Sequence, residues 1–351
     1  MIPKLDFYRG RRVFVTGHTG FKGSWLCRML ILAGAEVTGY ALPPADPSLF
    51  RLLRLDEEMN SVMGDVRDFR LLEKAYGEAS PEIVFHLAAQ PLVRESYRAP
   101  RETFDVNVTG TVNLLESVRR YGAKSVVNVT TDKVYKNDES GRAFSENEPL
   151  AGYDPYSNSK SCSELVTYSY RVSFFDPARI PVSTVRAGNV IGGGDFAADR
   201  IIPDCVRAVS AGEPVVVRNP NSVRPFQHVL EALTAYLTVA EKQFYDKTLA
   251  GAYNSGPDAV DCVTAGEVAR LFCEKWGDGA RLEVRGEVGA PHEAGLLRLD
   301  SKKLRETFGW SPKWHVDESI AETVAFAKVM AAGGDVKEEI DRQIRLFLSE
   351  E

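Results

Sequence analysis

Hydrophobic and polar positions alternate between two patterns over the first 190 residues. Longer stretches with apolar side chains at helical spacing lie at residues 21–35, at 102–122 and from 156 onward. Short runs rich in Val, Ile and Phe predict strands between them, at residues 11–17, 36–42, 61–66, 82–89, 124–131 and 181–190. Nearly continuous apolar strands separated by amphipathic helices indicate a parallel sheet covered on both faces. The first half is therefore predicted to be α/β, with a doubly wound parallel sheet.

The pattern becomes less regular after residue 188. Glycine and proline become denser in "IGGGD", "GEP" and "NPNSVRP". Helical patterns recur at "LEALTAYLTVAEKQF", "TAGEVARLFCEKW" and "VDESIAETVAFAKVM", and the first of these could return to cover the sheet. We expect residues 1–188, with 229–257 returning to them, to form the sheet domain. Residues 189–228 and 258–351 are expected to form a smaller C-terminal lobe partly interleaved with it.

Composition narrows the class of protein. Of the 351 residues, 44% are hydrophobic and 26% are charged, which is typical of a globular protein in water. The net charge of −6 argues against nucleic acid or an anionic membrane as a partner, since both favour basic surfaces. The five scattered cysteines form no CxxC pair, which favours free thiols in a reducing compartment. Neither a signal-peptide core nor an apolar stretch of transmembrane length is found, so we expect a cytoplasmic protein.

The segment "TGHTGFKG" joins the first strand to the following helix. Glycine permits positive φ and lets backbone N–H groups approach a pyrophosphate at a helix N-terminus. This strand, loop and helix together predict a Rossmann dinucleotide-binding loop. The cofactor contacts expected in it are Gly17, His18, Gly20, Phe21, Lys22 and Gly23.

The second strand ends in "VTGYAL", without the acidic residue that usually holds the adenosine ribose and without an arginine for a 2′-phosphate. We expect NAD rather than NADP. Asp65 and Val66, after the third strand, are candidate adenine contacts, although a turn with Asp65 as a helix cap explains them about as well. The small residues Ala88 and Ala89, after the fourth strand, would allow a cofactor to approach closely.

The stretch "YSNSK" places Tyr156 and Lys160 one helical turn apart. Two surface side chains would satisfy this spacing, but a lysine beside a phenol can also lower its pKa and make it a base. Thr131, the glycine loop and the Tyr156/Lys160 pair all lie at carboxyl ends of predicted strands, where doubly wound sheets bind ligands. Their common location favours a catalytic role.

These motifs resemble the extended short-chain dehydrogenase/reductase family. Longer strings, among them "TTDKVY", "GYDPYSNSKSCSELV" and "NPNSVRPFQHVLE", resemble the nucleotide-sugar 4,6-dehydratases, and most of all the branch that acts on CDP-glucose. The resemblance spans most of residues 12–232, and "PHEA" and "GWSPKW" extend it into the second lobe. It implies NAD as cofactor. It also implies a homodimer or higher homo-oligomer, joined through helices at about 103–121 and 156–174.

The resemblance implies oxidation at the sugar C4, loss of water across C5 and C6, and return of the hydride to C6. Tyr156 would take the proton of the C4 hydroxyl, Lys160 would keep the phenol ionised, and Thr131 would hydrogen-bond the C4 oxygen. Asp132 would protonate the departing C6 hydroxyl. Relatives often have Glu next as the C5 base, but this chain has Lys133. Either Lys133 is the base, or it acidifies the C5 proton while another group removes it.

The substrate residues implied by the resemblance lie mainly in the second half. Asn189 and Arg224 would contact the sugar diphosphate, for which a guanidinium is well suited. Arg94, Arg200 and Arg218 are further candidates, each with a surface charge or a structural ion pair as the alternative. His228 and His292 have no second ligand at metal spacing, so no metal is expected.

Three functions remain open from the sequence. The first is a 4,6-dehydratase for CDP-glucose. The second is a dehydratase or C4 epimerase for another nucleotide sugar, although Asp132 and Lys133 argue against an epimerase. The third is a non-enzymatic NAD-binding sensor, which would have no use for Tyr156, Lys160 and Thr131 together. The choice of cytosine rests on the resemblance alone.

Overall fold

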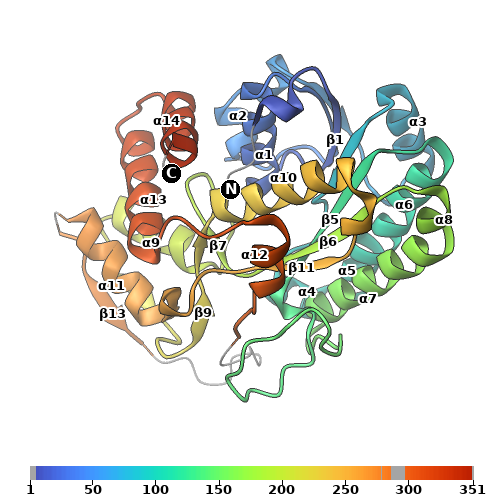
Figure 1. Ribbon diagram of the computed structural model, residues 1–351. Helices are drawn as coiled ribbons and strands as arrows, with labels where there is room; N and C mark the ends of the chain where they lie inside the picture. Colours follow the sequence, from blue (N-terminus) through green and yellow to red (C-terminus); the bar gives the residue numbers. More distant parts are fainter. Residues whose placement is uncertain (1–4, 278, 286–296, 350–351) are drawn as a thin grey trace.

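A computed structural model describes residues 5–277, 279–285 and 297–349. Its centre is a seven-stranded sheet in the order β11-β6-β5-β4-β1-β2-β3, with every neighbouring pair parallel (Figure 1). The strands are β1 (Arg12–Thr16), β2 (Glu36–Ala41), β3 (Asn60–Met63), β4 (Ile83–His86), β5 (Ser125–Thr131), β6 (Val182–Ala187) and β11 (Ala252–Ser255). The predicted α/β class with a doubly wound parallel sheet is confirmed.

Alternate residues of the strands enter two separate cores. In β1, Val13 and Val15 face one cluster, whereas Phe14 faces the other. Three helices cover the first face: α1 (Phe21–Leu32), α10 (Val229–Tyr245) and α14 (Val336–Ser349). The second face is covered by α3 (Phe69–Ala79), α6 (Gly110–Tyr121) and α7 (Pro155–Tyr170). In Figure 1, α10 crosses in front of the strands. Burial on both faces is the reason for the nearly continuous apolar strands.

The six predicted strands are all present, and the sheet has one more. β11 was not predicted as a strand, because its four residues "AYNS" are few and half polar. It extends the sheet by pairing with β6 from Ala252↔Thr184 to Ser255↔Ala187. Its Asn254 is buried, accepts a hydrogen bond from the Tyr135 hydroxyl at 2.6 Å and donates to the Phe144 carbonyl at 2.8 Å. These contacts satisfy the polar side chain inside the core.

The long helix expected at residues 102–122 is divided in the structure. It consists of α5 (Pro100–Phe104), the π-helical segment η3 (Asp105–Thr109) and α6. The helix that starts at Pro155 likewise continues through a π-helical segment, η5 (Arg171–Phe175), into α8 (Asp176–Ala178). Short helical elements link the other parts of this half: η1 (Leu5–Tyr8), α2 (Leu49–Leu52), η2 (Leu55–Glu57), α4 (Val93–Arg98), η4 (Asp132–Val134) and η6 (Lys247–Leu249).

The second lobe has its own core, to which α9, β8, α11 and α13 contribute buried residues such as Cys205, Val215, Phe272 and Ile320. Its elements are β7 (Val190–Ile191), α9 (Ile201–Ser210), β8 (Val215–Val217), β9 (Val223–Pro225), β10 (Gln227–His228), η7 (Ala259–Asp261), β12 (Cys262–Thr264), α11 (Ala265–Trp276), β13 (Leu282–Val284), α12 (Lys302–Phe308) and α13 (Val316–Ala331). The strands form three small sheets, β10-β7, β12-β9 and β13-β8. Helices α12, α13 and α14, which were assigned to the second lobe, also contribute buried residues to the core of the sheet domain. The two parts therefore share a core, and the domain boundaries stay a prediction.

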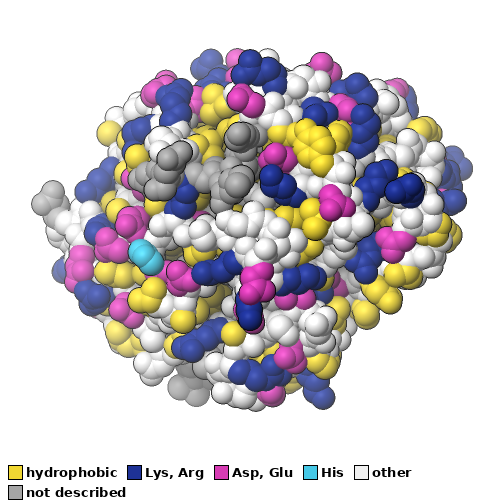
Figure 2. Space-filling model, in the orientation of Figure 1, with side chains coloured by type: hydrophobic (Ala, Val, Ile, Leu, Met, Phe, Trp, Pro, Cys, Tyr) yellow, Lys and Arg dark blue, Asp and Glu magenta, His cyan; other side chains and the backbone are white. Residues whose placement is uncertain are grey.

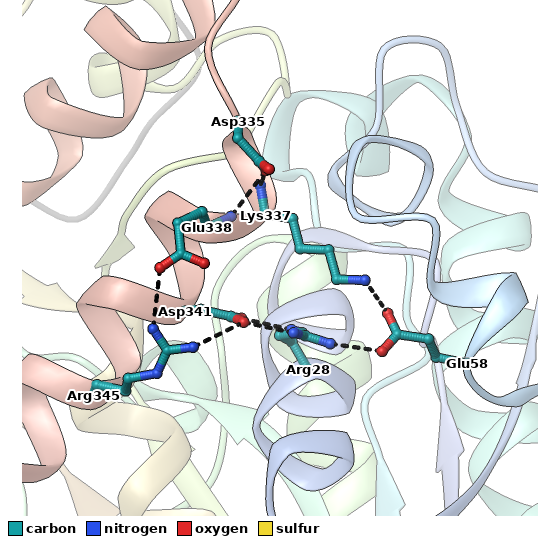
Figure 3. A network of polar contacts seen from close by, with 7 residues as sticks. All are labelled: Arg28, Glu58, Asp335, Lys337, Glu338, Asp341 and Arg345. Carbon is teal, nitrogen blue, oxygen red and sulfur yellow. Dashed lines mark hydrogen bonds and ion pairs between the residues drawn. The ribbon is translucent and has the colours of Figure 1, made fainter.

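A polar network fastens the last helix to the first (Figure 3). Arg28 of α1 donates two hydrogen bonds of 2.6 Å to the carboxylate of Asp341 on α14, and both side chains are buried. Arg28 also pairs with Glu58 at 2.9 Å, and Glu58 in turn accepts a hydrogen bond from Lys337 at 2.5 Å. Glu338 and Arg345 extend the network on the exposed side of α14. Residues far apart in the chain thus enclose one buried guanidinium.

The surface mixes the two signs of charge. On the face drawn in Figure 2, basic and acidic side chains are interspersed. No helix within 5–277, 279–285 or 297–349 combines the length and hydropathy needed to cross a membrane. All five cysteines are free.

Candidate active site

The glycine loop lies between β1 and α1, at the middle of the sheet. Gly17 has φ of +78°, and a Cβ there would lie 2.7 Å from the Ala88 nitrogen. A Cβ on Gly23 would lie 2.0 Å from the Gly17 carbonyl oxygen. Gly20 is the N-cap of α1 and offers no side-chain hydrogen bond to the helix N–H groups. The loop therefore requires glycine at 17 and 23 and presents free backbone donors at a helix N-terminus.

The structure explains why glycine is needed at position 39, within β2. The ring of His18 occupies the place beside Gly39, where a Cβ would lie 2.3 Å from the His18 Cγ. His18 is buried, and its Nε2 is 2.7 Å from the Ser61 hydroxyl. Burial lowers the pKa of His18 to about 4, so its imidazole is neutral at pH 7. The side chain of His18 packs inside the protein, and only its backbone can belong to the loop surface.

The remaining cofactor candidates lie after β3 and β4, where three of them make hydrogen bonds to neighbouring protein groups. The carboxylate of Asp65 pairs with Arg67 at 2.6 Å, and this hydrogen bonding lowers the pKa of Asp65. Val66 is buried, and its carbonyl accepts a hydrogen bond of 2.8 Å from Asn113. Ala88 and Ala89 follow β4, and the Ala88 N–H donates to the Thr16 hydroxyl at 3.2 Å. Asp65 is thus engaged by Arg67, which the sequence did not lead us to expect.

Thr131 and Tyr156 meet at the carboxyl end of β5. Tyr156 is the second residue of α7. The N-cap of this helix, Asp154, accepts a hydrogen bond from the Ser157 N–H. Burial raises the pKa of Tyr156 to about 12, while a hydrogen bond with Thr131 acts in the opposite direction. Lys160 turns its ammonium to the Val129 carbonyl at 2.9 Å, and burial lowers its pKa to about 8. The lowered phenol pKa expected from the sequence is not found, because desolvation, with the charges of Asp132 and Asp154, outweighs the hydrogen bond with Thr131 and the charge of Arg200.

Asp132 and Lys133 follow directly in the one-turn helix η4. Asp132 is buried; its Oδ1 accepts a hydrogen bond of 2.8 Å from Thr131, and no group in the described part of the chain contacts its Oδ2. The Lys133 ammonium lies 3.8 Å from Asp132 and 3.5 Å from the amide oxygen of Asn189. Both side chains line the same cavity as Tyr156. A carboxyl and an amine therefore lie side by side next to the phenol.

Lys22, expected at the cofactor, also faces this cavity. Its ammonium lies 3.5 Å from the hydroxyl of Tyr236 on α10. Burial and the charge of Arg200 lower the pKa of Lys22 to about 8, while Asp132 and Asp195 act to raise it. Lys22 thus contributes to the electrostatics of the catalytic residues as well as to the glycine loop.

One cavity of about 840 Å³ connects the sheet with the second lobe. Four of the five candidate catalytic residues line it, and only Lys160 lies behind the wall. Phe21 and Lys22 line it as well, whereas the other cofactor candidates lie outside its lining. The structure brings all five substrate candidates to the same cavity: Arg94, Asn189, Arg200, Arg218 and Arg224.

Two acidic partners of these arginines were missed from the sequence. Asp195 pairs with Arg200 at 2.7 Å. Asp199 lies between Arg94, at 3.5 Å, and Arg218, at 3.7 Å. Both aspartates lie in "GGGDFAADR", close to a predicted arginine, and this nearness was the available signal. Arg224 is buried and donates to the Val223 carbonyl at 2.9 Å.

Histidines are not grouped as a metal site would require. His228 is buried between Trp25 and Trp314, with ring centroids at 5.8 Å and 4.9 Å. His292 lies outside the described residues. Over the ranges that the structure describes, no three His, Cys, Asp or Glu side chains are placed to hold a metal ion.

Comparison with known proteins gives consistent matches over nearly the whole chain. A family model described as GDP-mannose 4,6 dehydratase matches residues 14–323. A CDP-glucose 4,6-dehydratase of Salmonella typhimurium is 48% identical, with 99% of each chain covered. A dTDP-glucose 4,6-dehydratase of Xanthomonas campestris is 27% identical over 88% of this chain and 91% of that protein.

Solved structures agree with the architecture. A crystal structure of Thermus thermophilus UDP-glucose 4-epimerase in complex with NAD superposes with a TM-score of 0.79 at 28% identity. The match covers 90% of this chain and 99% of that one. A Thermotoga maritima UDP-glucose 4-epimerase with UDP-glucose has the same TM-score at 23% identity, which shows the common fold.

Proposed function

This chain belongs to the GDP-mannose 4,6-dehydratase family of extended short-chain dehydrogenases/reductases, and we propose on this premise that it is an NAD-dependent lyase that converts CDP-glucose to CDP-4-keto-6-deoxyglucose and water. The observation that carries the proposal is the 48% identity, over 99% of both chains, with the Salmonella CDP-glucose 4,6-dehydratase. The cavity supports it, because a phenol, a carboxyl and an amine lie together at one end and arginines line the rest.

The glycine loop fits a dinucleotide. A Cβ would fill the space at Gly17 and Gly23, and the N-terminus of α1 has free N–H donors for a pyrophosphate. When bound, NAD⁺ supplies the acceptor for the C4 hydride and later returns that hydride to C6. We propose that Lys160, next to Tyr156 on α7, binds the nicotinamide ribose. Val66, Ala88 and Ala89 would lie against the adenosine and nicotinamide parts.

The first step is deprotonation of the sugar C4 hydroxyl by Tyr156, while Thr131 hydrogen-bonds the same oxygen. Because burial raises the pKa of Tyr156 to about 12, the phenol needs additional positive charge to act as a base at neutral pH. The charge of Arg200 already acts to lower the pKa of Tyr156, and Lys160, one turn further along α7, is the lysine proposed to add to it. Once the C4 hydride has left as well, the 4-keto group acidifies the C5 proton.

The second step is loss of water across C5 and C6. Asp132 lines the cavity, and we propose that its carboxyl protonates the departing C6 hydroxyl; its buried Oδ2 has no hydrogen-bond partner among the described residues. Lys133 would take the C5 proton, for which the ammonium must first lose one of its own protons. The Lys133 ammonium contacts Asn189 and Asp132 and lines the same cavity as the phenol. The elimination thus uses neighbouring residues of one short helix.

The arginines would bind the nucleoside diphosphate. Arg94 and Arg218 share Asp199, and Arg200 pairs with Asp195, so a diphosphate would compete with carboxylates for guanidinium groups that are already positioned. Arg224, buried at the cavity wall, is the fourth candidate.

A homodimer through the helices α6 and α7 belongs to the proposal. Apolar side chains are exposed along these helices and their π-helical continuation, including Tyr121, Leu165, Tyr168 and Phe174. A second copy packing there would cover them.

The test is a substrate panel. The purified protein with NAD⁺ is incubated with CDP-, UDP-, dTDP- and GDP-hexoses, and the 4-keto product is followed by its absorbance in alkali. Turnover confined to CDP-glucose is expected. Formation of a 4-keto product from another nucleotide sugar would support the proposed reaction and contradict the proposed substrate. Interconversion of UDP-glucose and UDP-galactose would indicate an epimerase. No turnover with cofactor bound would indicate a sensor.

A further inference from the structure

We propose that Glu213 selects the base of the substrate, by accepting a hydrogen bond from the 4-amino group of cytosine. The inference rests on the proposed function and deepens it, because it names a residue that would separate CDP-glucose from UDP- and dTDP-sugars. Glu213 lies in the turn between α9 and β8 and lines the cavity.

The position of Glu213 follows from the two walls of the cavity. One wall is the carboxyl end of β5 with Tyr156, where the sugar must react. The other is the second lobe, with α9 and β8. Asp199 pairs with Arg94 of α4, on the side of the sheet domain, and with Arg218, the residue after β8, in the second lobe, so these arginines lie between the two parts. A diphosphate bound there leaves the α9–β8 turn for the base.

Glu213 differs from the other acidic residues of the cavity in having no partner for its side chain. Six acidic side chains line the cavity, and five are engaged: Glu95 by Arg98, Asp132 by Thr131, Asp195 by Arg200, Asp199 by two arginines and Asp204 by Arg207. Throughout residues 5–277, 279–285 and 297–349, the Glu213 carboxylate makes no hydrogen bond or ion pair, and the residue is exposed on the turn. Its N–H donates to the Ala208 carbonyl at 2.9 Å, which fixes the turn. The carboxylate is therefore available to a ligand.

Cytosine and uracil differ in the group that a carboxylate can distinguish. Cytosine carries an amino donor at C4, whereas uracil and thymine carry a carbonyl acceptor there. A carboxylate only accepts hydrogen bonds, so it binds the amino group and repels the carbonyl. Ala208, Ala211 and Val215, which line the cavity around Glu213, leave room for a flat ring and offer no competing side-chain donor.

The test measures binding of CDP and UDP, which does not require turnover. Isothermal titration calorimetry would compare the wild type with Glu213→Gln in the presence of NAD⁺. The wild type is expected to bind CDP more tightly than UDP, and Glu213→Gln should lower that ratio roughly tenfold. Glu213→Lys, which replaces the acceptor with a donor, should lower it further and favour UDP. A CDP/UDP ratio in Glu213→Gln equal to that of the wild type would overturn the assignment.

Glu283→Gln is the matched control. Glu283 lies on β13, opposite Val216 of β8, pairs with Arg285 and does not line the cavity, so the same loss of charge there should leave the ratio unchanged. An equal fall of the ratio in Glu283→Gln would overturn the assignment, because the effect would then be one of overall charge. Thermal unfolding checks that all variants are folded.

Two failures are distinguishable. If the wild type turns over CDP-glucose while Glu213→Gln keeps the wild-type ratio, only the assignment of Glu213 falls. If the wild type binds UDP as tightly as CDP and does not turn over CDP-glucose, the proposed substrate falls, and the assignment of Glu213 falls with it.

Discussion

Lys133 and Tyr156 lie at the same end of the cavity but belong to different proposed steps. Tyr156→Phe removes the base for the C4 hydroxyl, so we expect oxidation and product formation to fall together, by about 10²-fold or more. Lys133→Ala retains Tyr156 and Thr131, so oxidation at C4 should continue while elimination stops. Mass spectrometry of the products after a single turnover separates the two, since oxidation alone removes two hydrogens and keeps the water.

Asn189→Ala serves as the control for the Lys133 variant, because it removes the partner of the Lys133 ammonium and keeps the amine. A smaller loss of elimination than in Lys133→Ala is expected. Normal formation of the 4-keto-6-deoxy product by Lys133→Ala would show that another group takes the C5 proton.

Buried histidine makes the protein sensitive to acid. His86 lies within β4, with its Nδ1 2.6 Å from the Thr16 hydroxyl and its Nε2 3.1 Å from the Thr111 hydroxyl. Burial, with a contribution from Lys160, lowers the pKa of His86 to about 3. The folded protein keeps this ring neutral, whereas the unfolded chain binds a proton below about pH 6.5. The free energy of unfolding should therefore decrease from pH 6.5 toward pH 3, by about 1.4 kcal/mol per pH unit for this group.

The measurement is urea unfolding at several pH values for the wild type and His86→Gln. The variant should take up about one proton fewer on unfolding near pH 5. His315→Gln should act in the opposite sense, because a hydrogen bond from His315 to Asp261 raises the pKa of His315. The stabilisation from that pair is present below the unfolded pKa and is lost as the pH rises through the folded one. Equal pH dependence in all three proteins would contradict the prediction.

At the scale of elements, the turn from β1 to α1 depends on two close approaches of the backbone. A Cβ at Gly23 would lie 2.0 Å from the Gly17 oxygen, whereas a Cβ at Gly20 would lie at an ordinary 3.4 Å. Gly23→Ala should therefore distort the loop and weaken NAD binding by roughly tenfold or more, since overpacking typically costs about 1–3 kcal/mol. Gly20→Ala should cause a smaller loss. Fluorescence titration with NADH compares the two, and equal affinities would contradict this account of the loop.

Local sequence patterns were enough to predict the elements formed by neighbouring residues. The first six strands are runs of β-branched and aromatic residues, and the glycine loop and "YSNSK" are continuous motifs. β11 was not predicted because its segment is short and partly polar. These four residues form a strand only through their pairing with β6 at the edge of the sheet. The π-helical segments η3 and η5 likewise lie inside ordinary helical patterns.

The polar surroundings of the site could not be predicted in the same way. Asp199 pairs with Arg94, which lies on another element, and such a contact is created by the tertiary fold. The direction of the Tyr156 pKa was also wrong from the sequence, because it depends on burial that the YxxxK spacing does not report. The sequence predicts which groups react, whereas their charge states depend on the burial and contacts that the fold creates.

At the scale of the whole molecule, the network around Arg28 should contribute strongly to stability. Asp341→Asn removes one charge from a buried pair with two hydrogen bonds of 2.6 Å, which should cost about 3 kcal/mol of unfolding free energy. Glu338→Gln, on the same helix, breaks an exposed pair with Arg345 and should cost at most about 0.5 kcal/mol. Denaturant unfolding measures both (Figure 3). Similar losses in the two variants would show that burial of Asp341 adds nothing.

The same network has a consequence for folding during synthesis, because its two ends are translated at very different times. Arg28 and Asp341 are 313 residues apart, so a ribosome needs roughly 15 to 60 s between them at about 5–20 residues per second. During this interval α1 has been synthesised, and α14, one of the helices that pack against it, has not. The nascent chain therefore carries Arg28 with its partner Glu58 already made and its buried partner Asp341 still untranslated. We expect the face of α1 that α14 later buries to stay accessible to solvent until synthesis ends, so the buried ion pair forms as one of the last steps of folding.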